Sequence, residues 1–234
     1  MKLPFSFTWT QDYTALVLTY VYLFGVIALG EFLRWAGSRP ASFTRKFIHI
    51  GVGMWVVGTA LLFETWYIAL IPPVSFVLIN SVSYLRGTFK AMESEDKGNL
   101  GTINFPISFA AVVYYFWPQP VLMVAAMMPL TWGDAMAAIV GQRHGHYRFT
   151  IAGRTRTLEG SIAMFLWSWV MTALALFTMP YLAGKPPIHW LVAMIYGAAV
   201  GLVCALVEAL TPLSLIHISE PTRLLRRSRM PSSA

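Results

Sequence analysis

Seven long apolar runs occupy most of this chain and decide what it can fold into. They lie at about residues 13–33, 48–63, 66–84, 103–117, 119–141, 160–179 and 188–210. Each is close to the roughly 20 residues that a helix needs to cross a hydrocarbon layer of about 30 Å. The runs lack the alternation of a membrane barrel, and open sheet edges do not persist in lipid. We therefore predict an all-α fold, a polytopic transmembrane helical bundle of about seven spans.

The composition supports a bilayer as the natural solvent. Hydrophobic residues make up 57% of the chain and charged residues only 12%, and a soluble domain this apolar would expose large patches to water. We expect residues 1–212 to form a single transmembrane domain. Its only cysteine, Cys204, lies in an apolar run, which excludes disulfides within the chain and cysteine-based metal sites. Pro72 and Pro73 are predicted to kink or break the third span.

The net charge is +7. The basic residues are distributed as membrane topology predicts, and they do not form the single stripe expected of a nucleic-acid-binding surface. Three alternate connections carry most of the basic residues, whereas the second and fourth carry none and the sixth has only Lys185. Alternate connections emerge on one side, and the positive-inside rule makes that side cytoplasmic. We predict an outside N-terminus, cytoplasmic active-site loops and a location in the plasma (inner) membrane. The basic residues of the three connections are Arg34, Arg39, Arg45 and Lys46; Arg86, Lys90 and Lys97; and Arg143, Arg148, Arg154 and Arg156.

The segment after Pro212 departs from this pattern. Residues 213–234 are polar and basic, unlike the bundle before them, and they resemble translated adapter sequence. We expect this segment to be non-native or a disordered basic tail, and we assign it no function.

Two polar clusters precede the central spans. Arg45 and Lys46 lie four and three residues before His49, so all three share one helix face. This face fits phosphate binding, or positive-inside anchoring with a histidine that reaches the interface.

In the third connection, Gly98 and Gly101 allow a tight turn that exposes amides to an anion before a helix. The acids of the same connection fit either a divalent-ion site or a solvated loop: Glu93, Glu95 and Asp96.

The densest polar signal begins at Asp134, which follows a long apolar run. An unpaired acid at the bilayer centre costs about 2.5–3.5 kcal/mol on insertion scales, so we expect a magnesium ion or an arginine to compensate it. Glu159 is predicted near the positive N-terminal end of the sixth span. Glu208 lies in the seventh run, where an acid indicates either a functional site or a charge at the helix end.

Five motifs occur in a fixed order: RKFIHIG, NLGTINFP, GDAMAAIVG, RTLEGS and LVEALTP. Together, over residues 20–212, they resemble the dolichol, phytol and diacylglycerol kinase family, part of a wider group of membrane CTP-transferases that includes phosphatidate cytidylyltransferase. The resemblance implies Mg²⁺-dependent phosphoryl transfer from CTP or ATP to the hydroxyl of a polyprenol, phytol, dolichol or diacylglycerol. Substrate, nucleotide and bilayer are the implied partners, with no nucleic acid.

The resemblance also implies which residues form the site. Asp134, Glu159 and His49 are the catalytic candidates, and the first two are also the metal candidates. The expected phosphate- and nucleotide-binding residues are Arg45, Lys46, Gly101, Thr102, Arg154, Arg156, Thr157, Gly160 and Ser161.

Two departures from the family pattern matter. Arg156 stands where the family commonly has lysine, which keeps the charge but changes its geometry. Family members also continue past LVEALTP into an Asp-Asn motif and another apolar helix, whereas here the basic segment follows. A phosphatidate cytidylyltransferase is the nearest rival, but its C-terminal His-Gly-Gly and Asp-Arg motifs do not occur in this sequence. A small transporter is the rival outside enzymes, and its polar residues would line the bundle centre and not the loops.

Overall fold

The computed structural model describes residues 9–37, 41–86, 101–151 and 154–210. The acidic residues 93–96, Gly98 and the segment 213–234 lie outside the described residues, so the predictions about them stay predictions.

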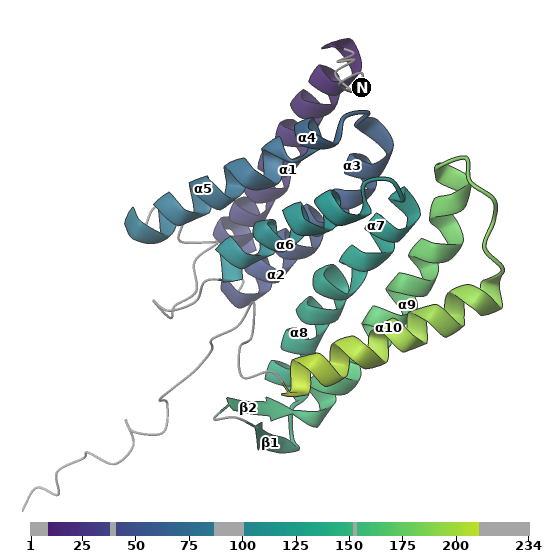
Figure 1. Ribbon diagram of the computed structural model, residues 1–234. Coiled ribbons are helices and arrows are strands. Elements are labelled where there is room, and N and C mark those ends of the chain that lie inside the picture. The colour runs from purple at the N-terminus through teal and green to yellow at the C-terminus, as the bar shows by residue number, and fades with distance from the viewer. Residues whose placement is uncertain (1–8, 38–40, 87–100, 152–153, 211–234) are drawn as a thin grey trace, which may run out of the picture.

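The described chain is mostly helical, as the sequence predicts (Figure 1). The N-terminal half contains α1 (Trp9–Gly37), α2 (Ala41–Met54), α3 (Val56–Leu62), α4 (Trp66–Ala69), α5 (Ile71–Arg86) and α6 (Gly101–Phe116). The C-terminal half contains α7 (Pro120–Met128), the π-helix η1 (Pro129–Gly133), α8 (Asp134–His144), β1 (Arg148–Ile151), β2 (Arg154–Thr157), α9 (Leu158–Leu182) and α10 (Trp190–Leu210).

Four helical segments are long and apolar enough to cross a membrane. They are Gln11–Gly37, the continuous run Pro120–His144, Leu158–Leu182 and Trp190–Leu210. Trp66–Val82 and Gly101–Phe116 are apolar but shorter. The structure therefore supports a transmembrane helical bundle, and the count of about seven spans stays a prediction. The first and last of the four bury only 17% of their most apolar window, so their outer faces are suited to contact lipid.

The prolines of the third apolar run break it, as predicted. α4 ends at Ala69 and α5 begins at Ile71, with Pro72 and Pro73 in its first turn. Prolines are tolerated there because the first amides of a helix have no intrahelical acceptor.

Glycines set the tightest helix contact, between α9 and α10. A Cβ atom at Gly197 would lie 2.8 Å from the Trp169 carbonyl oxygen, and one at Gly201 would lie 2.8 Å from the Phe165 carbonyl oxygen. Small residues four apart let two membrane helices approach through their backbones. The pair α9–α10 is thus a close-packed unit, against which η1 and α8 also pack.

A buried carboxylate joins α1 to the α3–α4 connection. Asp12 is fully buried and accepts hydrogen bonds from the amides of Glu64 at 3.0 Å and Thr65 at 3.4 Å, and from the Thr65 hydroxyl. These donors satisfy a charge that would otherwise be costly to bury.

The start of α1 lies at the top of the view in Figure 1, and the β1–β2 hairpin lies at the bottom.

The hairpin is the one departure of the described chain from an all-α fold. β1 and β2 pair antiparallel, with Arg148 opposite Thr157 and Ile151 opposite Arg154. Threonine and isoleucine favour extended backbone, and alternating exposure in β1 fits a two-stranded ribbon at the edge of the bundle. The sequence predicts no strand in this connection, because strands of four residues carry a weak pattern.

Candidate active site

A buried ion-pair cluster of Lys46, His49 and Asp134 forms where α2 meets the start of α8. The Lys46 ammonium donates to Asp134 Oδ2 at 3.1 Å, and the two side chains are 5% and 15% exposed. His49 Nε2 lies 3.8 Å from the same oxygen. Burial lowers the pKa of the Lys46 ammonium, and the Asp134 carboxylate opposes that shift. The charge that compensates Asp134 is thus a lysine, where the sequence had led us to expect an arginine or magnesium.

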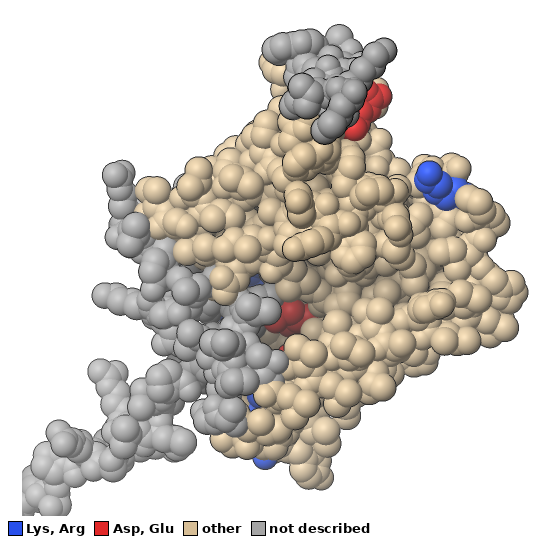
Figure 2. Space-filling view, viewed as in Figure 1, with Lys and Arg blue, Asp and Glu red and all other residues tan. Residues whose placement is uncertain are grey.

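The sequence correctly predicted that Lys46 and His49 share a helix face, because both reach Asp134 from α2. Arg45 is close enough for its charge to act on Lys46. Figure 2 shows how few charged residues lie on the described part of this face, with an acidic side chain in a recess among uncharged residues.

A π-helical turn presents Asp134 to this cluster. η1 runs from Pro129 to Gly133 and ends directly before Asp134. His49 Nε2 donates a hydrogen bond to the carbonyl oxygen of Leu130 in η1 at 2.8 Å. Such turns are rare, and they occur frequently at functional sites. The bond fixes a proton on Nε2 of His49, so this nitrogen is not a proton acceptor in the observed arrangement.

Glycines hold η1 tightly between two helices. A Cβ atom at Gly53 of α2 would lie 2.6 Å from Thr131 Cγ2, and one at Gly133 would lie 2.9 Å from Met164 Sδ of α9. Neither position accepts a larger side chain without movement of its neighbour. The register of Asp134 against Lys46 is therefore fixed from both sides.

The Gly-Thr motif opens α6, and a buried asparagine holds it. Pro106 lies inside α6, so it offers no amide to the carbonyl four residues earlier, that of Thr102. Asn80 of α5, only 6% exposed, donates its side-chain amide to that carbonyl at 2.7 Å. A polar residue in an apolar run is the only feature of the sequence that hints at this pairing. Gly101 is the first residue of the helix.

The second group of candidates lies at the hairpin–helix junction, which comprises Thr157, Glu159, Gly160 and Ser161. The Thr157 side chain caps α9 by accepting from the Gly160 amide at 3.2 Å. Glu159 lies in the first turn of α9, as predicted, and its Oε1 accepts from the amides of His146 at 2.9 Å and Tyr147 at 3.1 Å. The carboxylate thus satisfies backbone amides just beyond α8.

Close packing at this junction depends on glycine. A Cβ atom at Gly160 would lie 3.1 Å from the Ala137 carbonyl oxygen and 3.4 Å from the Gly141 Cα atom. α8 therefore links the two groups of candidates, because Asp134 begins it and the junction packs on its later turns.

Arg156 of β2 forms an ion pair with Glu208 near the end of α10. Their side chains are 13% and 27% exposed. The sequence had raised Glu208 as a functional acid or a helix-end charge, and the structure uses it to tie the hairpin to the last helix. The side chain of Arg154 lies outside the described side chains.

Two polar atoms of the junction are buried without a hydrogen-bond partner within the described part of the chain: Glu159 Oε2 and Ser161 Oγ. Buried polar atoms are nearly always bonded, so these two mark a place where a ligand fits. Oxygen donors of this kind suit a hard cation such as Mg²⁺. The described residues contain no group of three or more His, Cys, Asp or Glu side chains that would hold a metal ion by themselves.

Comparison with known proteins gives two informative relatives. The chain is 30% identical over 164 residues to a phytol kinase of Synechocystis sp., covering 69% of this chain and 70% of that protein. It is 25% identical over 166 residues to a chloroplastic farnesol kinase of Arabidopsis thaliana, covering 66% of this chain and 54% of that protein. The chain thus spans about half the length of the plant relative. No protein-family profile and no solved structure matches it.

Proposed function

The chain belongs to the phytol kinase family, and we propose on this premise that it phosphorylates a prenyl alcohol such as phytol or farnesol at a membrane surface. The phosphoryl donor is CTP or ATP. The observation that carries the proposal is the buried cluster of Lys46, His49 and Asp134, which places a carboxylate with its own cation among apolar helices.

Phosphoryl transfer needs little covalent chemistry from the protein, because catalysis is mostly positioning and charge neutralisation. The alcohol oxygen bonds to the terminal phosphorus as the bond to the leaving nucleotide breaks. The hydroxyl proton passes to the Asp134 carboxylate. The Lys46 ammonium holds that carboxylate in place through their ion pair. His49 acts as a positioning residue, since its Nε2 proton is held by the Leu130 carbonyl.

The triphosphate is proposed to bind across the hairpin–helix junction. Arg154 and Arg156 supply positive charge from β2, and Arg45 supplies it from α2. Arginine suits this role because its planar fork binds phosphate oxygens in pairs. Glu208 is bonded to Arg156, so a phosphate must compete with that carboxylate. Gly101 and Thr102 at the start of α6 are further candidates for phosphate contact.

Magnesium is proposed to bind at Glu159 with Ser161, since Glu159 Oε2 and Ser161 Oγ are buried without a hydrogen-bond partner among the described residues, or alternatively at Asp134. When bound, the ion neutralises charge on the triphosphate. Polyprenol, dolichol and diacylglycerol remain further candidate acceptors.

The test is a transfer assay on membranes that contain the chain, with γ-labelled CTP or ATP and each lipid alcohol. We expect label on prenyl monophosphate. Asp134→Asn should abolish transfer and leave membrane insertion intact, because the neutral amide accepts no proton. Asp12→Asn is the control, since Asp12 is also a carboxylate buried among the helices, at 0% exposure against 15% for the Asp134 side chain, but its recorded partners are Glu64 and Thr65. It should retain activity per folded molecule.

Three outcomes contradict parts of the proposal. Full activity of Asp134→Asn would refute the role of this carboxylate. CDP-lipid with release of pyrophosphate would identify a cytidylyltransferase instead. The absence of either product from every alcohol would favour the transporter.

A further inference from the structure

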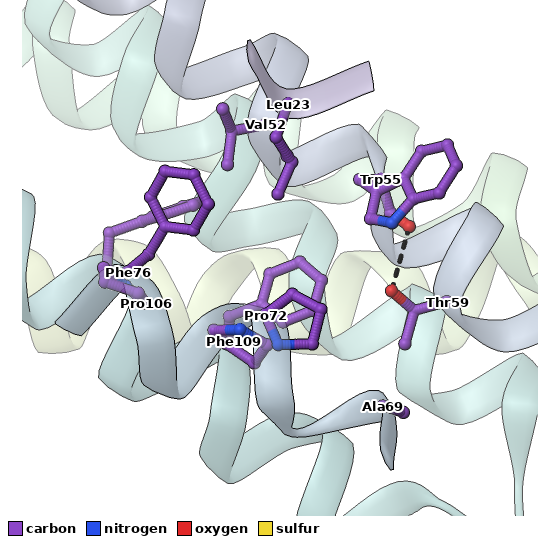
Figure 3. A pocket seen from close by; sticks show the side chains of 11 residues that line it. Leu23, Val52, Trp55, Thr59, Ala69, Pro72, Phe76, Pro106 and Phe109 are labelled. Atoms are coloured by element: carbon purple, nitrogen blue, oxygen red, sulfur yellow. Dashed lines mark hydrogen bonds between the residues drawn. The ribbon is translucent and has the colours of Figure 1, made fainter. Parts of the chain in front are cut away.

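An apolar groove lies between α1 and the helices α2 to α6 (Figure 3). It encloses about 370 Å³, part of it open to the surface. Aromatic side chains form much of its wall, among them Trp55, Phe76, Phe105 and Phe109.

The groove is chemically apolar even where polar side chains line it. The Thr59 hydroxyl donates to the Trp55 carbonyl at 3.2 Å. The Trp55 indole N–H donates to the Thr19 hydroxyl at 3.0 Å. Both polar groups are thus already bonded to the protein. An occupant gains apolar contact here and finds no directed polar partner.

One end of the groove is adjacent to the ion-pair cluster. Phe105 lines the groove, and its ring centroid lies 4.3 Å from that of His49. Val52, another lining residue, follows His49 by three positions on α2, so it lies one turn farther along the same face. One end of the groove therefore lies beside His49, whose Nε2 is 3.8 Å from Asp134 Oδ2.

The far end is marked by Thr59 and Ala69. Figure 3 shows Val52, Phe76 and Pro106 toward one end of the groove, and Thr59 with Ala69 at the other. Ten residues separate His49 from Thr59 along α2 and α3, which corresponds to about 15 Å at about 1.5 Å per residue.

We propose that this groove binds the isoprenoid chain of the substrate, with the hydroxyl end at the Lys46–His49–Asp134 cluster. The inference rests on the proposed function and adds the place where the hydrocarbon chain of the substrate binds. A single chain with methyl branches fits a narrow wall of rings and prolines. The polar esters of a diacylglycerol would find no polar partner in this groove, so the lining favours a hydrocarbon chain.

The test is chain-length selectivity. Ala69 is 1% exposed at the far end, so Ala69→Leu shortens the groove. We expect kcat/KM for phytol and geranylgeraniol to fall by about tenfold or more, and that for geraniol to stay within about twofold, because only the longer chains reach the block. Val52→Phe, at the near end, should lower kcat/KM for all three alcohols.

The matched control is Ala193→Leu, which adds the same volume at a position equally buried but on α10, away from the groove. It should change the three substrates alike. An equal change for geraniol and phytol in Ala69→Leu would overturn the groove assignment, and so would no change at all.

A second measurement needs no turnover. A phytol analogue with a diazirine at its tail, photolysed in membranes with the wild-type chain, should label peptides of residues 55–76. Label confined to α9 or α10 would contradict the proposal. A wild-type chain that phosphorylates no prenyl alcohol would overturn the function, and the labelled peptide would still report whether the groove binds the tail.

Discussion

The charged residues of the candidate site depend on each other because they are buried together. Lys46 is 4% exposed, and its ammonium has the Asp134 carboxylate as a direct partner. Two isolated charges in this position would be expensive. The cluster therefore forms the candidate site and also holds α2 against α8.

This dependence gives a prediction for Lys46→Met. Loss of the ammonium leaves Asp134 without its recorded cation, so we expect the free energy of unfolding to fall by about 3–5 kcal/mol. The double variant Lys46→Met with Asp134→Asn should recover most of that stability and still lack transfer activity. Thermal unfolding in detergent and the labelled-nucleotide assay check both parts. Equal stability of the single and double variants would contradict the coupling.

Sequence reasoning reached part of this site. Helical spacing correctly grouped Lys46 with His49, and it placed Glu159 in the first turn of its helix. It did not pair Lys46 with Asp134, because contacts between residues 88 positions apart leave no local pattern. The same limit applies to Phe105 against His49 and to Asn80 against Thr102.

At the scale of elements, the apolar runs and the break at Pro72 and Pro73 follow from composition and proline chemistry. The π-helical turn does not, because periodicity arguments assume one residue spacing throughout a helix. η1 changes that spacing between Pro129 and Gly133. A helix face that is predicted from the residue spacing in α7 therefore does not continue into α8. The hairpin was missed for another reason, since strands of four residues carry a weak pattern.

A prediction at this scale concerns the Asn80–Thr102 bond. Asn80→Leu leaves the Thr102 carbonyl without this donor, and we expect a loss of about 1–3 kcal/mol in unfolding free energy. Pro106→Ala restores an amide to α6 that can donate to the same carbonyl. Adding it to Asn80→Leu should therefore recover much of the loss, as measured by thermal unfolding. Additive losses in the double variant would show that the bond is not what stabilises α6.

At the scale of the whole molecule, four candidate spans and a nearly apolar surface fit a bilayer protein. The orientation is a prediction from the distribution of lysine and arginine. The location in the plasma membrane is also a prediction. The plant relative is named as a chloroplastic protein, so the comparison does not support that location. α9 joins the hairpin connection to the α9–α10 connection, so, with α9 as a span, we predict that the two open on opposite faces of the membrane.

Cysteine labelling tests the orientation. Arg143, at the end of α8, and Lys185, between α9 and α10, are both exposed. In a Cys204→Ala background, Lys185→Cys should react with an impermeant maleimide on intact cells, whereas Arg143→Cys should react only after permeabilisation. The reverse pattern would invert the topology. Reaction of both on intact cells would refute α9 as a span.

The two long-range ion pairs have a consequence for biogenesis. A chain leaves the ribosome from its N-terminus, so Lys46 reaches the membrane 88 residues before Asp134 is made. Arg156 likewise precedes Glu208, its partner on the last described helix. Each early cation must stay at the water interface until the later helix arrives with its acid. We therefore expect the candidate site to assemble late in translation, and a nascent bundle lacking α10 has Arg156 without Glu208.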